Sequence, residues 1–122
     1  MFSWKRPDYL GVQDGRLARP KRTPNCVSSQ ADPADRDHYI APIKGEFSRV
    51  RKAVESMPGA TVIEEKANYL YAEFRTPLLG FVDDVEFLLQ DGVIHVRSAS
   101  RLGRRDFGVN RKRIETLRKM LS

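Results

Sequence analysis

The chain has 122 residues, 40% hydrophobic and 31% charged, which is enough for one domain and too little for two sizeable cores. No apolar stretch approaches the roughly 20 residues of a transmembrane helix, and the first residues lack the apolar segment of a signal peptide, so we expect a cytoplasmic protein without a membrane partner. The formal net charge is +6, and the whole excess comes from residues 101–122, which hold eight Lys or Arg against two Asp or Glu.

The first part of the chain is predicted to be an irregular arm. Residues 1–45 contain five of the seven prolines and show neither the two-residue period of strands nor the 3.6-residue period of helices. The single cysteine, Cys26, lies here, so an internal disulfide is impossible and a reducing compartment fits. We predict one domain, made of this arm and a compact core over residues 46–122.

The core begins with a helix and continues as a sheet. Apolar residues at helical spacing predict a helix over 46–57, which Pro58 and Gly59 end. Four strands follow, at residues 60–65, 68–75, 81–89 and 93–101. Their short connections exclude crossover helices and favour an antiparallel meander.

A second helix is predicted at the end of the chain. It runs from about Arg111 to Leu121, with Asn110 as its N-cap and an apolar stripe facing inward. The predicted fold class is therefore α+β, a four-stranded antiparallel meander with two helices on one face and an irregular N-terminal arm.

The dipeptide Asp91-Gly92 fixes the register of the last two strands if it forms a type I′ turn. Asp83 then faces Ser100 on the core side of the sheet, with Ser98 two residues further along the adjacent strand. A carboxylate in that position is costly unless hydrogen bonds or a cation compensate for its lost hydration. The start of the last helix can approach this end of the sheet.

The other face of the predicted sheet carries polar residues and is expected to meet solvent. Glu86 lies opposite Arg97 on this face, as a cross-strand pair of opposite charge. Tyr69, Tyr71 and Glu73 lie on the same side of the preceding strand.

Three consecutive cations, Arg111, Lys112 and Arg113, stand where the last helix begins. A helix N-terminus is already positive because of its aligned peptide dipoles, so these cations need a partner, either Asp83 or a bound anion. The binding candidates are Asp83, Ser98, Ser100, Arg101, Asn110 and Arg111.

Three motifs resemble those of the domain-of-unknown-function family numbered 1499. They are PNCVSSQ at 24–30, GFVDDVEFLL at 80–89 and IHVRSASRLGRRDFGVNRKRIE at 94–115, and the resemblance covers nearly the whole chain from Pro20 onward. It implies that the family's motif positions include Cys26, Ser28, Ser29, Asp83, Asp84, Arg97, Ser98, Ser100, Arg101, Asp106, Asn110 and Arg111. The family has no established activity, so the resemblance implies no reaction.

Three function classes remain open. The favoured one is a noncatalytic module that binds a small anion or an acidic partner surface through Arg101, Arg104, Arg105 and the helix start. The second is sequence-nonspecific nucleic-acid binding by the same cations, which is less favoured because Phe107 is the only aromatic residue among them. A solvated basic face without any ligand is the remaining noncatalytic interpretation.

The third class is an enzyme that uses Cys26 as nucleophile and His38 as base. A lone cysteine is more often a buried, inert side chain, and we favour that interpretation. Asp83 and Asp84 are adjacent on a strand and point to opposite faces, so they cannot act as a pair. Neither His38 nor His95 has further ligands at metal-site spacing. The sequence therefore leans against an enzyme and predicts no metal and no cofactor.

Overall fold

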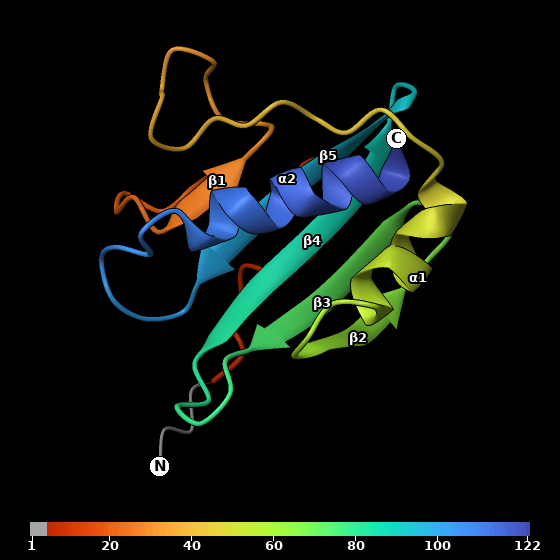
Figure 1. The fold of residues 1–122 in the computed structure, drawn as a ribbon. Coiled ribbons are helices and arrows are strands. Elements are labelled where there is room, and N and C mark those ends of the chain that lie inside the picture. The colour runs from red at the N-terminus through yellow and green to blue at the C-terminus, as the bar shows by residue number, and fades with distance from the viewer. Residues whose placement is uncertain (1–4) are drawn as a thin grey trace.

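The computed structural model describes residues 5–122 and consists of one antiparallel sheet with both helices on one face (Figure 1). The strands are β1 (Cys26–Ser28), β2 (Ala60–Glu65), β3 (Tyr69–Arg75), β4 (Val82–Gln90) and β5 (Val93–Ser100), in the spatial order β1-β5-β4-β3-β2. A short 3-10 helix η1 (Phe47–Arg49) leads into α1 (Val50–Glu55), and α2 (Val109–Leu121) ends the chain. The α+β class and the two helices are confirmed.

The sheet has five strands, so the prediction of four is wrong. The additional strand, β1, lies inside the segment predicted to be irregular, whose first four residues fall outside the described part of the chain. It pairs antiparallel with β5, with Cys26 opposite Ala99 and Ser28 opposite Arg97. Three residues are too few to show a two-residue period. Nor does a hairpin join β1 to its partner, so nothing local marks it as a strand.

The predicted register of the β4–β5 hairpin is confirmed. Asp83 pairs with Ser100, and Glu86 pairs with Arg97. The turn residues Asp91 and Gly92 have φ values of 53° and 77°, as a type I′ turn requires.

The main core lies between the helices and the sheet. Its buried residues are Val27, Ile40, Ile43, Val50, Val54, Leu70, Ala72, Phe74, Val85, Phe87, Ile94, Val96, Ile114, Leu117 and Leu121. Three of them, Val27, Ile40 and Ile43, belong to the N-terminal arm. The arm is thus an integral part of the packing, because it supplies buried apolar surface.

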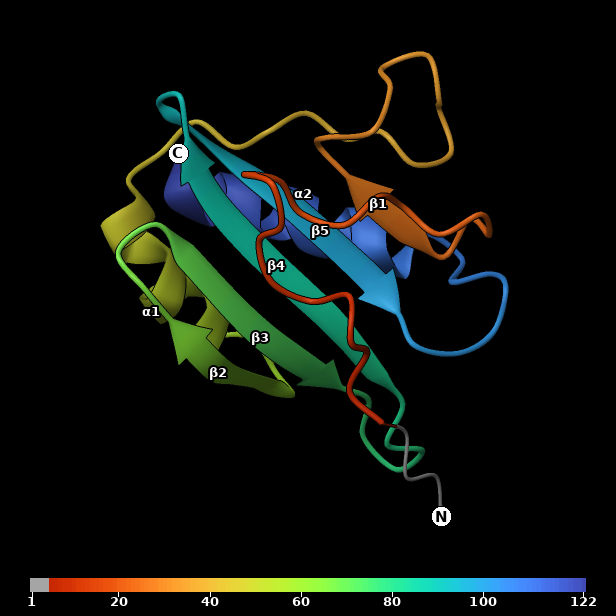
Figure 2. The same ribbon diagram turned by 180° about the vertical axis from the view of Figure 1, so that it is seen from behind.

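The second face of the sheet is covered as well, contrary to the expectation that it meets solvent. Residues 5–20 cross it as an irregular coil (Figure 2). Leu17 packs there against Tyr69, Tyr71 and Leu88 in a second, smaller apolar cluster. The arm therefore closes the face that the alternating strand pattern left polar.

Glu86 and Arg97 hold the arm instead of forming the expected cross-strand ion pair. Glu86 Oε2 accepts hydrogen bonds from the Tyr69 hydroxyl at 2.6 Å and from the Gly11 amide at 2.7 Å. Arg97 donates to the Arg19 carbonyl at 3.0 Å. Glu86 and Arg97 are only 0% and 1% exposed, and burial raises the pKa of Glu86.

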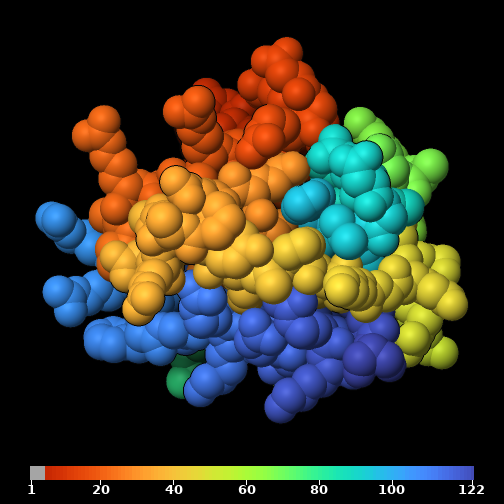
Figure 3. All heavy atoms as spheres, turned by 90° about the horizontal axis from the view of Figure 1, so that it is seen from above, coloured from red at the N-terminus to blue at the C-terminus, as the bar shows by residue number. Residues whose placement is uncertain are grey.

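Cations of α2 bind the backbone of the segment between β1 and η1. Arg118 donates to the carbonyls of residues 41–42 at 2.7 Å each, and Arg111 donates to those of residues 36–37 at 3.2 and 3.5 Å. Figure 3 shows this segment lying along α2. Part of the basic C-terminal segment thus serves the fold, because it satisfies carbonyls of a segment without regular structure.

We predict that Leu17→Ala lowers the free energy of unfolding by about 2–4 kcal/mol, because it removes a buried side chain from the contact between arm and sheet. Val12→Ala is the matched control, since Val12 is 41% exposed on the same arm, and it should change stability by less than about 0.5 kcal/mol. Urea denaturation measures both variants. Equal, small effects would show that the contact of Leu17 with the sheet contributes nothing to stability.

Candidate functional site

The start of α2 is capped by Asp106 and not by Asn110. The helix begins at Val109, and the residue before it, Gly108, has a left-handed backbone with φ 81°. Asp106 Oδ1 accepts a hydrogen bond from the Gly108 amide and Oδ2 accepts one from the Asn110 amide, both at 3.0 Å. Burial raises the pKa of Asp106, but these hydrogen bonds outweigh it and bring the pKa below its ordinary value. The prediction of Asn110 as N-cap is therefore wrong, because a carboxylate four residues upstream already satisfies the helix dipole.

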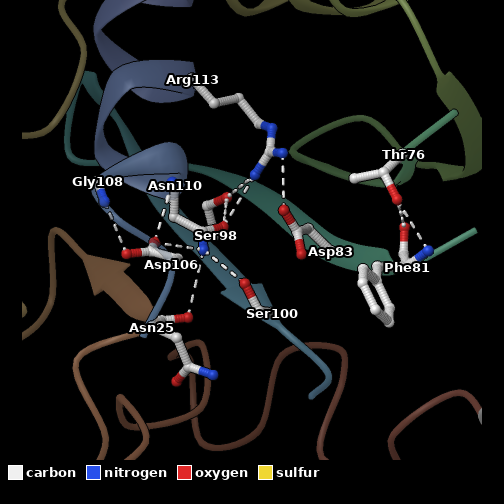
Figure 4. A network of polar contacts seen from close by, with 10 residues as sticks. All are labelled: Asn25, Thr76, Phe81, Asp83, Ser98, Ser100, Asp106, Gly108, Asn110 and Arg113. Carbon is white, nitrogen blue, oxygen red and sulfur yellow. Dashed lines mark hydrogen bonds and ion pairs between the residues drawn. The ribbon is translucent and has the colours of Figure 1, made fainter. Parts of the chain in front are cut away.

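Asn110 instead lies buried in the first turn of α2, where its side chain joins the helix to the sheet (Figure 4). Its Oδ1 accepts a hydrogen bond from the Ser98 hydroxyl at 2.6 Å. Its Nδ2 lies within hydrogen-bond distance of Ser100 Oγ at 2.9 Å, Asp106 Oδ2 at 2.8 Å and the Asn25 carbonyl at 3.3 Å. One side chain thus connects α2, β5 and the segment before β1.

Asp83 is buried on the core side of β4, as its strand phase predicts, and it pairs with Arg113. Arg113 Nη2 lies 2.7 Å from Asp83 Oδ2, and Nη1 donates to Ser98 Oγ at 3.0 Å. The guanidinium carbon is 4.6 Å from the centre of the Phe74 ring. A cation of the helix start therefore does face Asp83, but it is Arg113 and not Arg111.

Arg101 lies on the opposite face of the sheet, under the arm. Its Nε and Nη2 contact Asp84 at 2.9 and 2.8 Å, and Nη2 also contacts Glu73 at 2.7 Å. Tyr71 donates to Asp84 at 2.5 Å in the same cluster. These contacts, with the hydrogen bond to Asp84 foremost, raise the pKa of Arg101.

Four of the six predicted binding residues therefore meet in one place, and two do not. Asp83, Ser98, Ser100 and Asn110 form a single network with Arg113, whereas Arg101 and Arg111 lie elsewhere. Ser98 and Asn110 are 0% exposed, so most of this network is a sealed polar core. The contacts of this network connect α2 to the sheet, which is a structural role.

Sequence reasoning omitted Arg113 from the candidate set, although a signal for it was present. Arg113 follows Asn110 by three residues, and residues three apart in a helix share a face. An inward-pointing Asn110 therefore implies an inward-pointing Arg113.

Cys26 is fully buried on the face that the arm covers. Burial raises the pKa of its thiol, which keeps the thiol protonated at neutral pH. His38, its predicted base, binds Asp35 at 2.7 Å and the Thr23 carbonyl at 2.8 Å instead. This arrangement therefore does not support Cys26 as a thiolate nucleophile.

Metal and membrane features can be stated for residues 5–122 only. No group of three His, Cys, Asp or Glu side chains in that range is placed to hold a metal ion. None of the helices there is long and apolar enough to cross a membrane.

Two open cavities flank the loop between β5 and α2. One, of about 340 Å³, is bordered by Arg36, Arg105 and Arg111, and we call it the arginine pocket. The other, of about 570 Å³, lies between this loop and the β3–β4 loop and is mostly apolar, with Asp83 and Ser100 at its edge. Sequence reasoning missed Arg36, because only the folded arm brings it to the start of α2.

The family model described as Protein of unknown function (DUF1499) matches residues 16–121, which is most of the chain. The chain belongs to this family. The resemblance of the three sequence motifs is thus confirmed, and all twelve motif positions lie inside the matched range. No curated protein and no solved structure matches the chain, so the function of this DUF1499 protein has to be inferred from its geometry.

We predict that Asp83→Leu lowers the free energy of unfolding by about 3–5 kcal/mol, because it leaves Arg113 buried without a counter-charge. The double variant Asp83→Leu/Arg113→Met should lose less than the single variant, since no buried charge is left unpaired. Guanidinium denaturation of both variants measures the difference. A guanidinium midpoint unchanged in Asp83→Leu would show that the pair is not part of the stabilising network.

We predict that Cys26 reacts slowly with a thiol reagent in the native state and rapidly after denaturant is added, because the thiol is buried and protonated. The rate of colour release from a disulfide reagent at neutral pH measures this, and the protein has no other cysteine to interfere. Rapid native-state labelling would restore the nucleophile hypothesis.

Proposed function

We propose that this DUF1499 protein is a noncatalytic binding module for a small anion or an acidic partner surface, and that the arginine pocket is its binding site. The observation that carries the proposal is the convergence of Arg36, Arg105 and Arg111 on one open cavity. These residues come from the arm, from the loop after β5 and from α2. Arginine recognises phosphate and carboxylate groups through its planar fork of N–H donors.

The charge of the pocket supports anion binding. Within residues 5–122, no carboxylate lies at ion-pair distance from Arg36, Arg105 or Arg111. Asp106 borders the pocket, but its oxygens accept hydrogen bonds from the amides of the helix start. Three guanidinium groups and the two carboxylates of Asp37 and Asp106 border the cavity. Its formal charge is therefore +1, and its potential is positive.

The residues around the pocket support binding without catalysis. Its border is formed by Pro24, Val27, Arg36, Asp37, Arg105, Asp106, Phe107, Gly108 and Arg111. This set contains no Cys, His, Ser or Lys, and of its two carboxylates Asp106 already accepts hydrogen bonds from the amides of the helix start. The three arginines therefore support recognition of negative charge.

Sequence-nonspecific nucleic-acid binding is the alternative. Phe107 is 93% exposed beside Arg105. Proteins bind single-stranded nucleic acid by stacking bases on aromatic side chains while cations contact the phosphate backbone.

The enzyme hypothesis based on Cys26 and the cytoplasmic location stay predictions from the sequence.

We predict that inorganic phosphate raises the melting temperature, because at ten times its Kd it adds about 1.4 kcal/mol to the free energy of unfolding. Arg111→Gln should abolish the response, because it removes one side of the pocket. Lys119→Gln is the matched control, since Lys119 is an exposed cation on the same helix outside the pocket. Differential scanning calorimetry over a phosphate series measures all three proteins.

A mixed-sequence oligonucleotide separates the two functions. Binding that weakens steeply with salt and needs Arg104 and Phe107 would favour nucleic acid. A flat response to both phosphate and oligonucleotide, in the wild type, would refute the anion pocket.

A further inference from the structure

Exposed apolar side chains concentrate at one end of the sheet. Leu78 and Leu79 lie at the tip of the β3–β4 loop and are 106% and 62% exposed, and Phe107, in the loop between β5 and α2, is 93% exposed. Figures 1 and 2 show both loops at the same end of the sheet. Full exposure of large apolar side chains at two neighbouring loop tips is unusual for a surface that meets only water.

The folded loops hold these side chains outward. The Thr76 amide donates to the Phe81 carbonyl at 2.9 Å. Thr76 Oγ1 accepts a hydrogen bond from the Phe81 amide at 2.9 Å (Figure 4), and the two contacts close the base of the first loop. Leu78 has φ 69° and Phe107 has φ 53°, a left-handed backbone that bulky residues disfavour. Strain of this kind, at two exposed apolar residues, indicates a role outside the fold.

An apolar groove separates the two tips. The 570 Å³ cavity is lined by Phe81 and Val82 on one side and by Leu102, Phe107 and Val109 on the other. A mostly apolar groove that opens between two protruding tips suits a flexible hydrocarbon chain that enters from the outside.

The exposed charges beside the tips are positive. Arg75, Arg104 and Arg105 are exposed beside them, and residues 75–82 and 99–105 contain no Asp or Glu. Two carboxylates, Asp83 and Asp106, follow these ranges and line the groove. Asp83 pairs with Arg113, and Asp106 is turned inward onto the helix amides. An apolar tip within a positive rim is complementary to an anionic lipid surface, whose phosphates lie above its acyl chains.

We propose that this end of the molecule, the loop-tip surface formed by Leu78, Leu79, Phe107, Arg104 and Arg105, docks on an anionic membrane. The apolar tips enter the interface, the arginines bind headgroup phosphates, and the groove takes part of an acyl chain. The expectation of no membrane partner rested on the lack of a spanning segment. Docking from one side needs no such segment, because the inserted groups are side chains of folded loops.

The full chain is to be tested by sedimentation with vesicles. One preparation is phosphatidylcholine alone, and the other contains three parts phosphatidylcholine to one part phosphatidylglycerol. We expect binding to the anionic vesicles that is at least about tenfold stronger than to the neutral ones. Leu78→Ser/Phe107→Ser should lower the partition coefficient at least about tenfold, because large apolar side chains no longer leave water. Since both side chains are exposed, the variant should melt like the wild type.

Two matched controls separate the contribution of the apolar tips from that of Arg104 and Arg105. Ile63→Ser changes an exposed apolar residue on β2, away from the tips, and should alter partition by less than about twofold. Arg104→Ser/Arg105→Ser should weaken anionic binding about tenfold or more. Lys52→Ser/Lys119→Ser removes the same net charge from the helices and should weaken it by less than about threefold, because screening limits the reach of distant charges.

Three outcomes would overturn the docking surface. The first is no sedimentation with either vesicle, and the second is undiminished binding of the tip variant. The third is an oligomer, seen by light scattering without lipid, that the tip variant converts to a monomer, which would assign the tips to self-association. The loop-tip surface shares Arg105 and Phe107 with the border of the arginine pocket, but it does not need Arg36 or Arg111. Arg111→Gln should lose the phosphate response and keep vesicle binding within about twofold, so each proposal can fail alone.

Discussion

The contact on which the fold depends is the buried pair of Asp83 and Arg113. Burying either charge without its partner would be costly, because the charge loses its hydration. The 2.7 Å contact between the two side chains compensates for that loss and makes the burial of both possible. The pair also fixes the first turns of α2 against β4, while Asn110 ties the same turns to β5 and to the segment before β1. The helix is therefore placed by directional polar contacts as well as by its apolar stripe.

The basic character of the C-terminal segment has two different physical origins. Arg113 and Arg118 serve the fold, since one neutralises a buried carboxylate and the other satisfies carbonyls of the arm. Arg104 and Arg105 lie exposed in the loop before α2. A count of charges along the sequence does not distinguish these two pairs of arginines. Of these four, only Arg104 and Arg105 are exposed, so only their charges are free to attract a partner.

The N-terminal arm covers the polar face of the sheet and binds its charged side chains. Glu86 and Arg97 would face water on an open sheet, but the arm passes over them and binds to both. Leu17 adds an apolar contact beside them. Both faces of the sheet are thus covered, and the free surface with a distinct chemical character lies at the end where the β3–β4 and β5–α2 loops meet.

The sequence by itself determined what local chemistry controls. The Asp91-Gly92 turn sets the register of β4 and β5 because its backbone twist admits one pairing, and that register places Asp83 on the core side. Only the tertiary structure decided that β1 joins the sheet, that the arm covers its second face, and that Arg36 approaches the start of α2. These contacts join segments about 50 or more residues apart. No local periodicity or turn chemistry encodes them, because their partners are chosen by packing of the whole chain.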